Sequence, residues 1–204
     1  MPVGASSFEV ADPKDFQVGD RVQVKRPSTQ EWITALGTDD FGGGVSALGW
    51  KQGDVDLYFD RTIVAITGRK ITVDVPLTTS LDQNYGGATV AKYSWPGRIY
   101  NVGIENLTLV SDFDRSNPKD EEHRWMAVTF TNVEDAWVRQ LSFKHFAGSA
   151  VFINETAKRI TVEDCISTQP VSEIGGQRRY TFLHVDSKPF SSDALQPMGI
   201  MITV

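Results

Sequence analysis

Three stretches of the sequence share one eight-residue pattern. They are residues 102–109 (VGIENLTL), 136–143 (AWVRQLSF) and 160–167 (ITVEDCIS). Apolar or small residues occupy the first, third, sixth and eighth positions, so the alternation of a β-strand slips by one residue at a polar pair and then resumes. Such a slip needs a corner between two short strands, and Asn106 and Asp164 tolerate the left-handed backbone of a corner. The pattern therefore predicts a repeated unit of strand, bend and strand.

The spacing of the three stretches predicts a solenoid. Their starting positions are 34 and 24 residues apart, and such self-similarity is typical of coils that complete one another's core. Leu107, Leu141 and Cys165 share one position of the pattern, so we expect them to stack inside, one per coil. The first interval is longer by 34 − 24 = 10 residues, and residues 112–122 (DFDRSNPKDEE) have the polar composition of an inserted loop. Insertions of this kind commonly build the binding face of a solenoid.

The residues before the repeat have a different organisation. Short alternating runs predict β-strands at residues 7–10, 20–26, 55–66 and 70–77. Gly68 between the last two runs is a hairpin signal, and nothing indicates a long helix. We expect a small, hairpin-rich all-β module over residues 1–95 and the coils over residues 96–204. Residues 77–96, rich in Gly and Thr, are expected to cross between these two parts.

The repeat resembles the coils of the right-handed parallel β-helix of the pectate-lyase-like superfamily (the pectin lyase fold). The V-x-I-x-N-L bend at residues 102–107 carries this likeness. Four further strings are similar to uncharacterised bacterial secreted β-helix proteins that are assumed to act on glycans: RPSTQEWI (residues 26–33), DEEHRW (120–125), HFAGSAV (145–151) and PVSEIGGQRR (170–179). The resemblance implies an all-β protein with a partial right-handed parallel β-helix of about three coils. It also implies a carbohydrate-active protein with a polysaccharide partner, but it names no reaction.

Ionisable and aromatic residues collect in three segments that follow the eighth position of the pattern. They are residues 120–125, Lys144 with His145, and residues 170–179. Because neighbouring coils lie about 4.8 Å apart, we expect these segments to reach one groove. We predict catalytic roles for His123, Glu122, His145 and Arg179, and substrate binding by Trp125, Lys144, Glu173 and Arg178.

The residue types in these segments favour an acidic glycan. Trp125 is suited to stack on a sugar face, and His123 or Glu122 to transfer a proton. An arginine pair can bind a uronate carboxylate, and one arginine can stabilise the enolate that develops in β-elimination. These roles predict a polysaccharide lyase or a glycosidase. The alternatives are a non-catalytic glycan-binding or structural β-helix and an inactive truncated fragment, and Glu173 with an arginine could equally form a structural ion pair.

Composition limits the partners and cofactors. The net charge is −6 and no Lys/Arg cluster alternates with aromatic residues, which argues against nucleic-acid binding. No apolar run approaches the ~18 residues of a membrane span, so no membrane partner is predicted. The three histidines lack zinc-ligand spacing, and we predict no metal site or cofactor. Calcium stays open as an alternative, because oxygen ligands are present in Asp112, Asp114, Asp120, Glu121 and Glu122.

The two ends of the chain suggest a fragment. No basic stretch followed by an apolar one stands at the start, which together with the resemblance predicts a piece of a longer secreted or periplasmic protein. From about residue 185 the alternation is lost, and Pro189 and Pro197 disfavour central strands. Back-translation of this tail allows a second reading frame, so ordinary irregularity and a frameshift both stay open. Exposed coil edges of such a fragment predict self-association.

Overall fold

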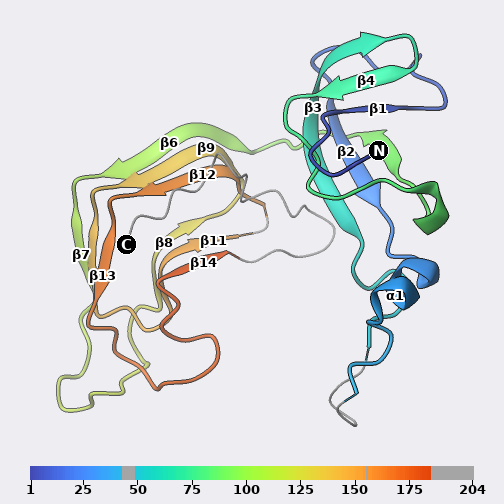
Figure 1. Cartoon of the computed structure of the whole chain (residues 1–204). Coiled ribbons are helices and arrows are strands. Elements are labelled where there is room, and N and C mark those ends of the chain that lie inside the picture. The colour runs from blue at the N-terminus through green and yellow to red at the C-terminus, as the bar shows by residue number, and fades with distance from the viewer. Residues whose placement is uncertain (43–48, 155, 185–204) are drawn as a thin grey trace. The chain divides into compact units, whose positions relative to one another are not determined.

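A computed structural model describes residues 1–42, 49–154 and 156–184 (Figure 1). The chain forms two compact units, one of residues 1–95 and one that begins at Pro96. None of the helices in the described ranges has the length and apolar character that crossing a membrane requires. The irregular tail predicted from about residue 185 lies outside the described residues.

The first unit is built on a five-stranded antiparallel sheet. Its strands lie in the order β1-β4-β3-β2-β5, with β1 at Ser7–Glu9, β2 at Arg21–Arg26, β3 at Leu57–Thr67, β4 at Lys70–Val73 and β5 at Thr89–Lys92. Alternate residues of β2 are fully buried, including Val22 and Val24, and they pack against Phe59 and Ile71. The hairpin expected at Gly68 joins β3 to β4, and Gly68 has the positive φ of 58° that such a tight turn requires. The all-β character of this module is confirmed.

Two features of the first unit differ from the prediction. A short helix, α1 (Gln30–Leu36), starts at an N-cap where the Thr29 hydroxyl accepts from the Trp32 amide, and it ends at the left-handed Gly37. Residues 77–96 do not cross out of the unit as expected. Leu77 is fully buried in its core, and the segment then forms the short helix η2 (Gln83–Tyr85) and β5, which pairs with β2.

The second unit consists of three coils of parallel strands, counted over the described residues. The first coil contains β6 (Ile99–Glu105), β7 (Thr108–Val110) and β8 (Met126–Phe130). The second contains β9 (Val133–Arg139), β10 (Ser142–Lys144) and β11 (Ser149–Ile153), and the third contains β12 (Lys158–Glu163), β13 (Ile166–Thr168) and β14 (Phe182–His184). Equivalent strands form three parallel sheets that Figure 1 shows stacked coil on coil. A partial parallel β-helix is therefore confirmed.

The strand register reproduces the eight-residue pattern. Val102 pairs with Ala136, and Ala136 pairs with Ile160, so the three starting positions lie side by side. The second residue of each polar pair has a left-handed backbone, with φ of 58° at Asn106, 56° at Gln140 and 53° at Asp164. These three residues make the corner between the first and second strand of each coil, which confirms the predicted bend.

The interior of the coils follows the predicted stack with one exception. Leu141 and Cys165 are almost fully buried beside Phe143 and Ile160. Leu107, at the equivalent position of the first coil, is 50% exposed.

One buried position of the β-helix carries charge. The Glu134 carboxylate, in β9, lies 3.6 Å from a guanidinium nitrogen of Arg98 and 4.0 Å from the ammonium of Lys158, and all three side chains are buried. Arg159 donates to both Glu134 and Asp135, and the Asp135 bond measures 2.6 Å. The carboxylates on β9 therefore bind cations from the neighbouring coils.

Candidate functional site

The three predicted segments leave the same corner of the β-helix. Each connects the second strand of a coil to its third strand, as residues 111–125, 145–148 and 169–181. We call these the first, second and third corner loops. The first and third are long and the second is short, so the two long loops reach past the second to contact each other.

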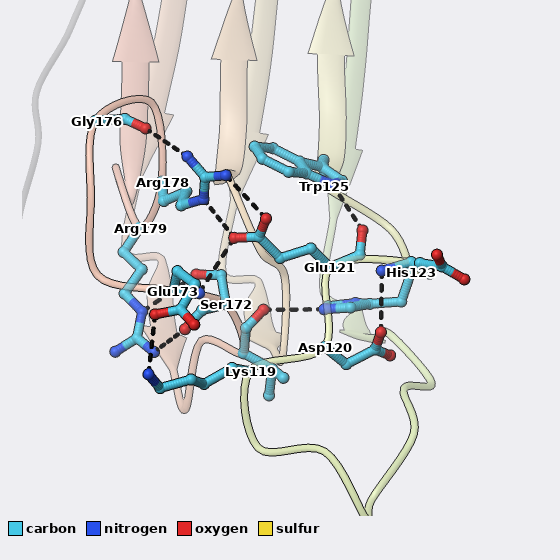
Figure 2. Close-up of polar contacts among 12 residues, drawn as sticks. Lys119, Asp120, Glu121, His123, Trp125, Ser172, Glu173, Gly176, Arg178 and Arg179 are labelled. Atoms are coloured by element: carbon cyan, nitrogen blue, oxygen red, sulfur yellow. Dashed lines mark hydrogen bonds and ion pairs between the residues drawn. The ribbon is translucent and has the colours of Figure 1, made fainter.

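An ion pair joins the two long loops. Glu121 in the first accepts two hydrogen bonds from the Arg178 guanidinium in the third, from Nε to Oε1 and from Nη2 to Oε2, the latter at 2.9 Å (Figure 2). The Arg178 guanidinium also lies over the Trp125 ring, 5.4 Å from its centroid, and the Trp125 indole donates to the Glu121 carbonyl at 3.0 Å. The hydrogen bonds from Arg178 lower the pKa of Glu121 below its ordinary value and favour the charged form of that carboxylate.

Glu173 extends this contact on the other side. Its backbone amide donates to Glu121 Oε1 at 3.1 Å, and its carboxylate pairs with Lys119 of the first corner loop at 3.0 Å. Both side chains of the second pair are more than half exposed, so that ion pair is weak.

His123 is a second link between the long loops. Its Nε2 lies 2.9 Å from the Val171 carbonyl, which can only accept, so Nε2 carries a hydrogen. Its Nδ1 lies 2.8 Å from Ser111 Oγ, which also accepts a hydrogen bond from the Arg124 amide. Both ring nitrogens are therefore used within the protein.

Arg179 is held inside the third corner loop. Its guanidinium donates from Nε to Ser172 Oγ at 3.2 Å and from Nη2 to the Ser172 carbonyl, and Ser172 is fully buried. Its backbone amide donates to the Ala147 carbonyl of the second corner loop at 3.0 Å. The loop is thereby fastened to the neighbouring coil.

The remaining predicted residues lie farther from these links. His145 contacts the edge of the Phe113 ring, with centroids 5.0 Å apart, and its Nε2 lies 3.3 Å from Gln169 Oε1. Glu122 is exposed beside His123, and Lys144 is exposed at the end of β10. The structure thus places six of the eight residues in three groups of contacts, which are Trp125, Glu173 and Arg178 around Glu121, His123 and His145 around Phe113, and Arg179 with Ser172. Glu122 and Lys144 are exposed.

The first corner loop encloses an open hollow of about 580 Å³. One aromatic ring, that of the half-buried Phe113, belongs to the lining, which consists otherwise of polar residues: Asp112, Asp114, Asn117, Asp120, Glu121, Glu122 and His123. Asp120 forms the floor of the loop, because its carboxylate accepts from the amides of Asp114 and Glu122. These bonds keep the pKa of Asp120 below its ordinary value. Asp112 and Glu122 are exposed and offer acceptors to a ligand.

Metal ligands are not assembled in the described part of the chain. No group of three or more His, Cys, Asp or Glu side chains lies close enough to hold an ion there. The five acidic residues considered for calcium instead divide among backbone amides, Arg178 and solvent.

Sequence reasoning missed three residues that hold the site together. Glu121 was considered only as a calcium ligand, and Ser111 and Ser172 carried no signal at all. Their partners are Arg178, His123 and Arg179, and the first of these pairs spans 57 positions. The period of the repeat could have suggested that the two long loops meet, but not which side chains bind.

Comparisons with known proteins support only a general likeness. No protein-family model and no curated protein sequence matches this chain. Among solved structures, the tailspike protein gp49 of Pseudomonas phage LKA1 matches with a TM-score of 0.36 and 11% identity, over 81% of this chain and 27% of that one. The Gp54 tailspike of Acinetobacter baumannii bacteriophage AP22, solved in complex with A. baumannii capsular saccharide, matches with a TM-score of 0.35 and 10% identity, over 81% of this chain and 36% of that one. The tailspike gp61 of Pseudomonas phage phi297 matches with a TM-score of 0.36 and 11% identity, over 83% of this chain and 30% of that one. The chain spans about a third of the length of these tailspikes.

Proposed function

We propose that this chain is a non-catalytic, carbohydrate-binding segment of a β-helix protein, and that saccharide binds in the hollow of the first corner loop. The observation that carries the proposal is the combination in one hollow of the Phe113 ring with the outward acceptors Asp112, Asn117 and Glu122. A sugar presents both C–H groups, which pack on an aromatic face, and hydroxyls, which donate to carboxylates. Specific sites for small ligands combine such apolar and polar groups in a concave surface.

The loop that forms the hollow is fixed before a ligand arrives. Asp120 binds two amides within the loop, and Glu121 and His123 attach it to the third corner loop. A site that needs no ordering on binding loses less conformational entropy, so affinity is gained without additional contacts. The proposed role of the Glu121 and His123 contacts is to provide this rigidity.

Binding explains the geometry better than catalysis does. A general base needs a free lone pair within reach of its substrate, whereas His123 uses both nitrogens for Ser111 and Val171. The arginine that would stabilise an enolate must face the substrate, whereas Arg179 donates to Ser172 and Arg178 is neutralised by Glu121. The catalytic and substrate-binding roles predicted from the sequence stay predictions, and these contacts favour the non-catalytic alternative.

The lining favours a neutral saccharide in this hollow. Asp112, Asp114 and Glu122 would repel a uronate or a sulfate, and Arg178 is already paired with Glu121. We infer that hydroxyl groups, not acidic groups, are recognised here. We further propose that the longer parent protein belongs to the pectate-lyase-like superfamily, is secreted or periplasmic, and meets its polysaccharide there.

A direct binding measurement tests this function. Calorimetric titration of the chain with short neutral oligosaccharides should detect binding that Phe113→Ala removes, because the stacking face is lost. Tyr180→Ala is the matched control, since Tyr180 is an exposed aromatic residue of the third corner loop outside the hollow. Titrations with calcium and with a chelator should give the same affinity.

A lyase assay separates the enzyme from the binding protein. Incubation with acidic polysaccharides should produce no ultraviolet absorbance from an unsaturated uronate. Growth of that signal, together with its loss in a folded Arg179→Gln variant, would overturn the proposed function in favour of β-elimination. Equal affinity of the unchanged chain and Phe113→Ala for neutral oligosaccharides would exclude the hollow as the site.

A further inference from the structure

Arg26 in the first unit is a buried cation whose guanidinium has no hydrogen-bond acceptor among the residues that the structure describes. It ends β2 and is only 3% exposed. Its guanidinium carbon lies 3.8 Å from the centroid of the Trp32 ring. Nη1 is buried without an acceptor, and the guanidinium makes no hydrogen bond to any residue that the structure describes. Burial lowers the pKa of this guanidinium.

Arg61 shows how the same unit treats an arginine with a structural role. This side chain is also fully buried, but Nε donates to the Val75 carbonyl at 2.8 Å, Nη1 to the Asp60 carbonyl at 3.0 Å and Nη2 to the Pro76 carbonyl at 2.7 Å. Each nitrogen has an acceptor, as expected for a buried polar group. Arg26 differs from Arg61, because its buried Nη1 has no such acceptor among the described residues.

The carboxylate of Asp56, which attracts Arg26 electrostatically, is bound by other residues. Asp56 Oδ1 accepts from the Ser28 amide at 2.8 Å and from the Ser28 hydroxyl at 2.9 Å, while Oδ2 pairs with Lys25 at 2.9 Å. Asp56 therefore attracts the guanidinium at a distance without binding it. A negative group brought in by a ligand would not have to displace an existing partner.

Aromatic rings lie next to this guanidinium. Trp32 and Trp50 are nearly parallel, at 12° with centroids 5.9 Å apart, and the Phe41 ring meets Trp50 edge-on at 6.0 Å. Both tryptophans are half-buried and Phe41 is 51% exposed, so the cluster reaches the surface. Trp32 lies in α1, and the caps of this helix, Thr29 and Gly37, fix where it begins and ends.

We propose that Arg26, Trp32 and Trp50 form a second saccharide site, specific for sugars that carry a carboxylate. The carboxylate would accept two hydrogen bonds from the guanidinium fork, and the sugar ring would pack on the tryptophan pair. A cationic ligand is disfavoured, because Arg26 already occupies a face of Trp32. The proposal rests on the first unit alone and does not depend on the hollow of the first corner loop.

The test compares an acidic oligosaccharide with its own carboxyl-reduced form. The full chain is titrated with short uronic-acid oligosaccharides and with the reduced, neutral products, and binding is followed by calorimetry and by the indole signals of the tryptophans in NMR spectra. We expect binding of the acidic form and at least a tenfold weaker affinity for the reduced form, since one charged hydrogen-bonded pair is lost. Equal affinities for the two forms would overturn the proposal.

Variants locate the site. Arg26→Gln and Trp50→Ala should each weaken binding of the acidic oligosaccharide about tenfold or more. Arg26→Lys should weaken it as well, because a lysine retains the charge but lacks the fork. Lys14→Gln is the matched control: it removes one positive charge from the same unit, at a side chain that is 73% exposed and pairs with Asp12. Unchanged affinity in folded Arg26→Lys and Trp50→Ala variants contradicts the site even if Arg26→Gln fails to fold.

Simple anions provide the last comparison. Inorganic sulfate and phosphate should compete only weakly, because they lack a ring to pack on Trp32 and Trp50. If either anion alone bound as tightly as the oligosaccharide, the site would be a plain anion site and the saccharide assignment would be wrong.

Discussion

Glu121 and Arg178 stand 57 positions apart in the sequence, and their side chains form a two-hydrogen-bond ion pair between the first and third corner loops. The pair joins the loops of the first and third coils directly. This is possible because the corner loop of the second coil is short, at residues 145–148. Loops of a solenoid usually depend on their own coil and its immediate neighbours. Here one carboxylate makes the conformation of the third corner loop depend on the first.

Glu121→Gln should loosen the third corner loop without unfolding the β-helix. The amide of Glu173 donates to the Glu121 carboxylate, so its hydrogen exchange should accelerate, and so should exchange at neighbouring amides of that loop. Exchange in β9 and β12 should not change. Glu122→Gln, which removes the same charge one residue later at an exposed side chain, should leave exchange in the third corner loop as it was.

The same contact should weaken in acid. Arg178 holds the pKa of Glu121 below its ordinary value of 4.5, so the folded chain binds fewer protons at this carboxylate than the unfolded chain does. Its contribution to stability is therefore complete above pH 4.5 and is lost as the pH falls through the lower pKa of the folded state. Protection factors of the Glu173 amide should stay constant from neutral pH to about pH 5 and then drop. In Glu121→Gln this drop should be absent, and its persistence would assign the acid transition to another group.

The coils were predictable because their signal is local and repeated. Val102, Ala136 and Ile160 occupy equivalent positions in the sequence and pair in the structure, since a strand alternates with period two and a corner shifts that period at a fixed place. Helix α1 was missed although Thr29 and Gly37 are ordinary cap residues, because one buried position, Ile33, gives no visible periodicity.

The side-chain contacts of the site were predictable only in part. The repeat placed His123, His145 and Arg179 on loops of one corner, which the structure bears out as geometry. It could not show that His123 meets Val171 or that Arg179 meets Ser172, because such contacts depend on the path of loops that do not share the period. Catalytic and structural side chains are the same residue types in the sequence, and only their contacts in the structure distinguish them.

Equivalent leucines in successive coils should differ in their cost of truncation. Leu141→Ala removes an almost fully buried side chain from between two coils and should lower the free energy of unfolding by about 2–5 kcal/mol. Leu107→Ala changes the same position of the first coil, where half of the side chain is exposed, and should cost less than half as much. Chemical denaturation of both variants measures the difference. Equal costs would show that Leu107 is covered in solution.

Gly103→Ala should destabilise the β-helix by steric conflict. A Cβ atom at this position would lie 2.1 Å from Cε2 and 2.2 Å from Nε1 of Trp137, the residue that pairs with Gly103 on the next coil. Displacement of the indole would also break its hydrogen bond to Glu105, and overpacking typically costs about 1–3 kcal/mol. Gly175→Ala is the matched control, since a Cβ atom there meets nothing within 4 Å. Thermal melting of the two variants should separate them clearly.

Glu134→Gln should be among the most damaging changes that conserve side-chain size. The buried carboxylate contacts Arg98, Lys158 and Arg159, and its neutralisation would leave these cations with less negative charge in a region of low dielectric. Breaking a buried pair in this way typically costs about 3–5 kcal/mol, because the remaining charges are poorly solvated. Glu105→Gln removes a carboxylate that is 44% exposed and pairs with Arg139 at 3.9 Å, and it should cost under about 1 kcal/mol. Urea unfolding of the two variants at neutral pH gives the comparison. A small effect at Glu134 would mean that Asp135 alone is enough to hold Arg159 in place.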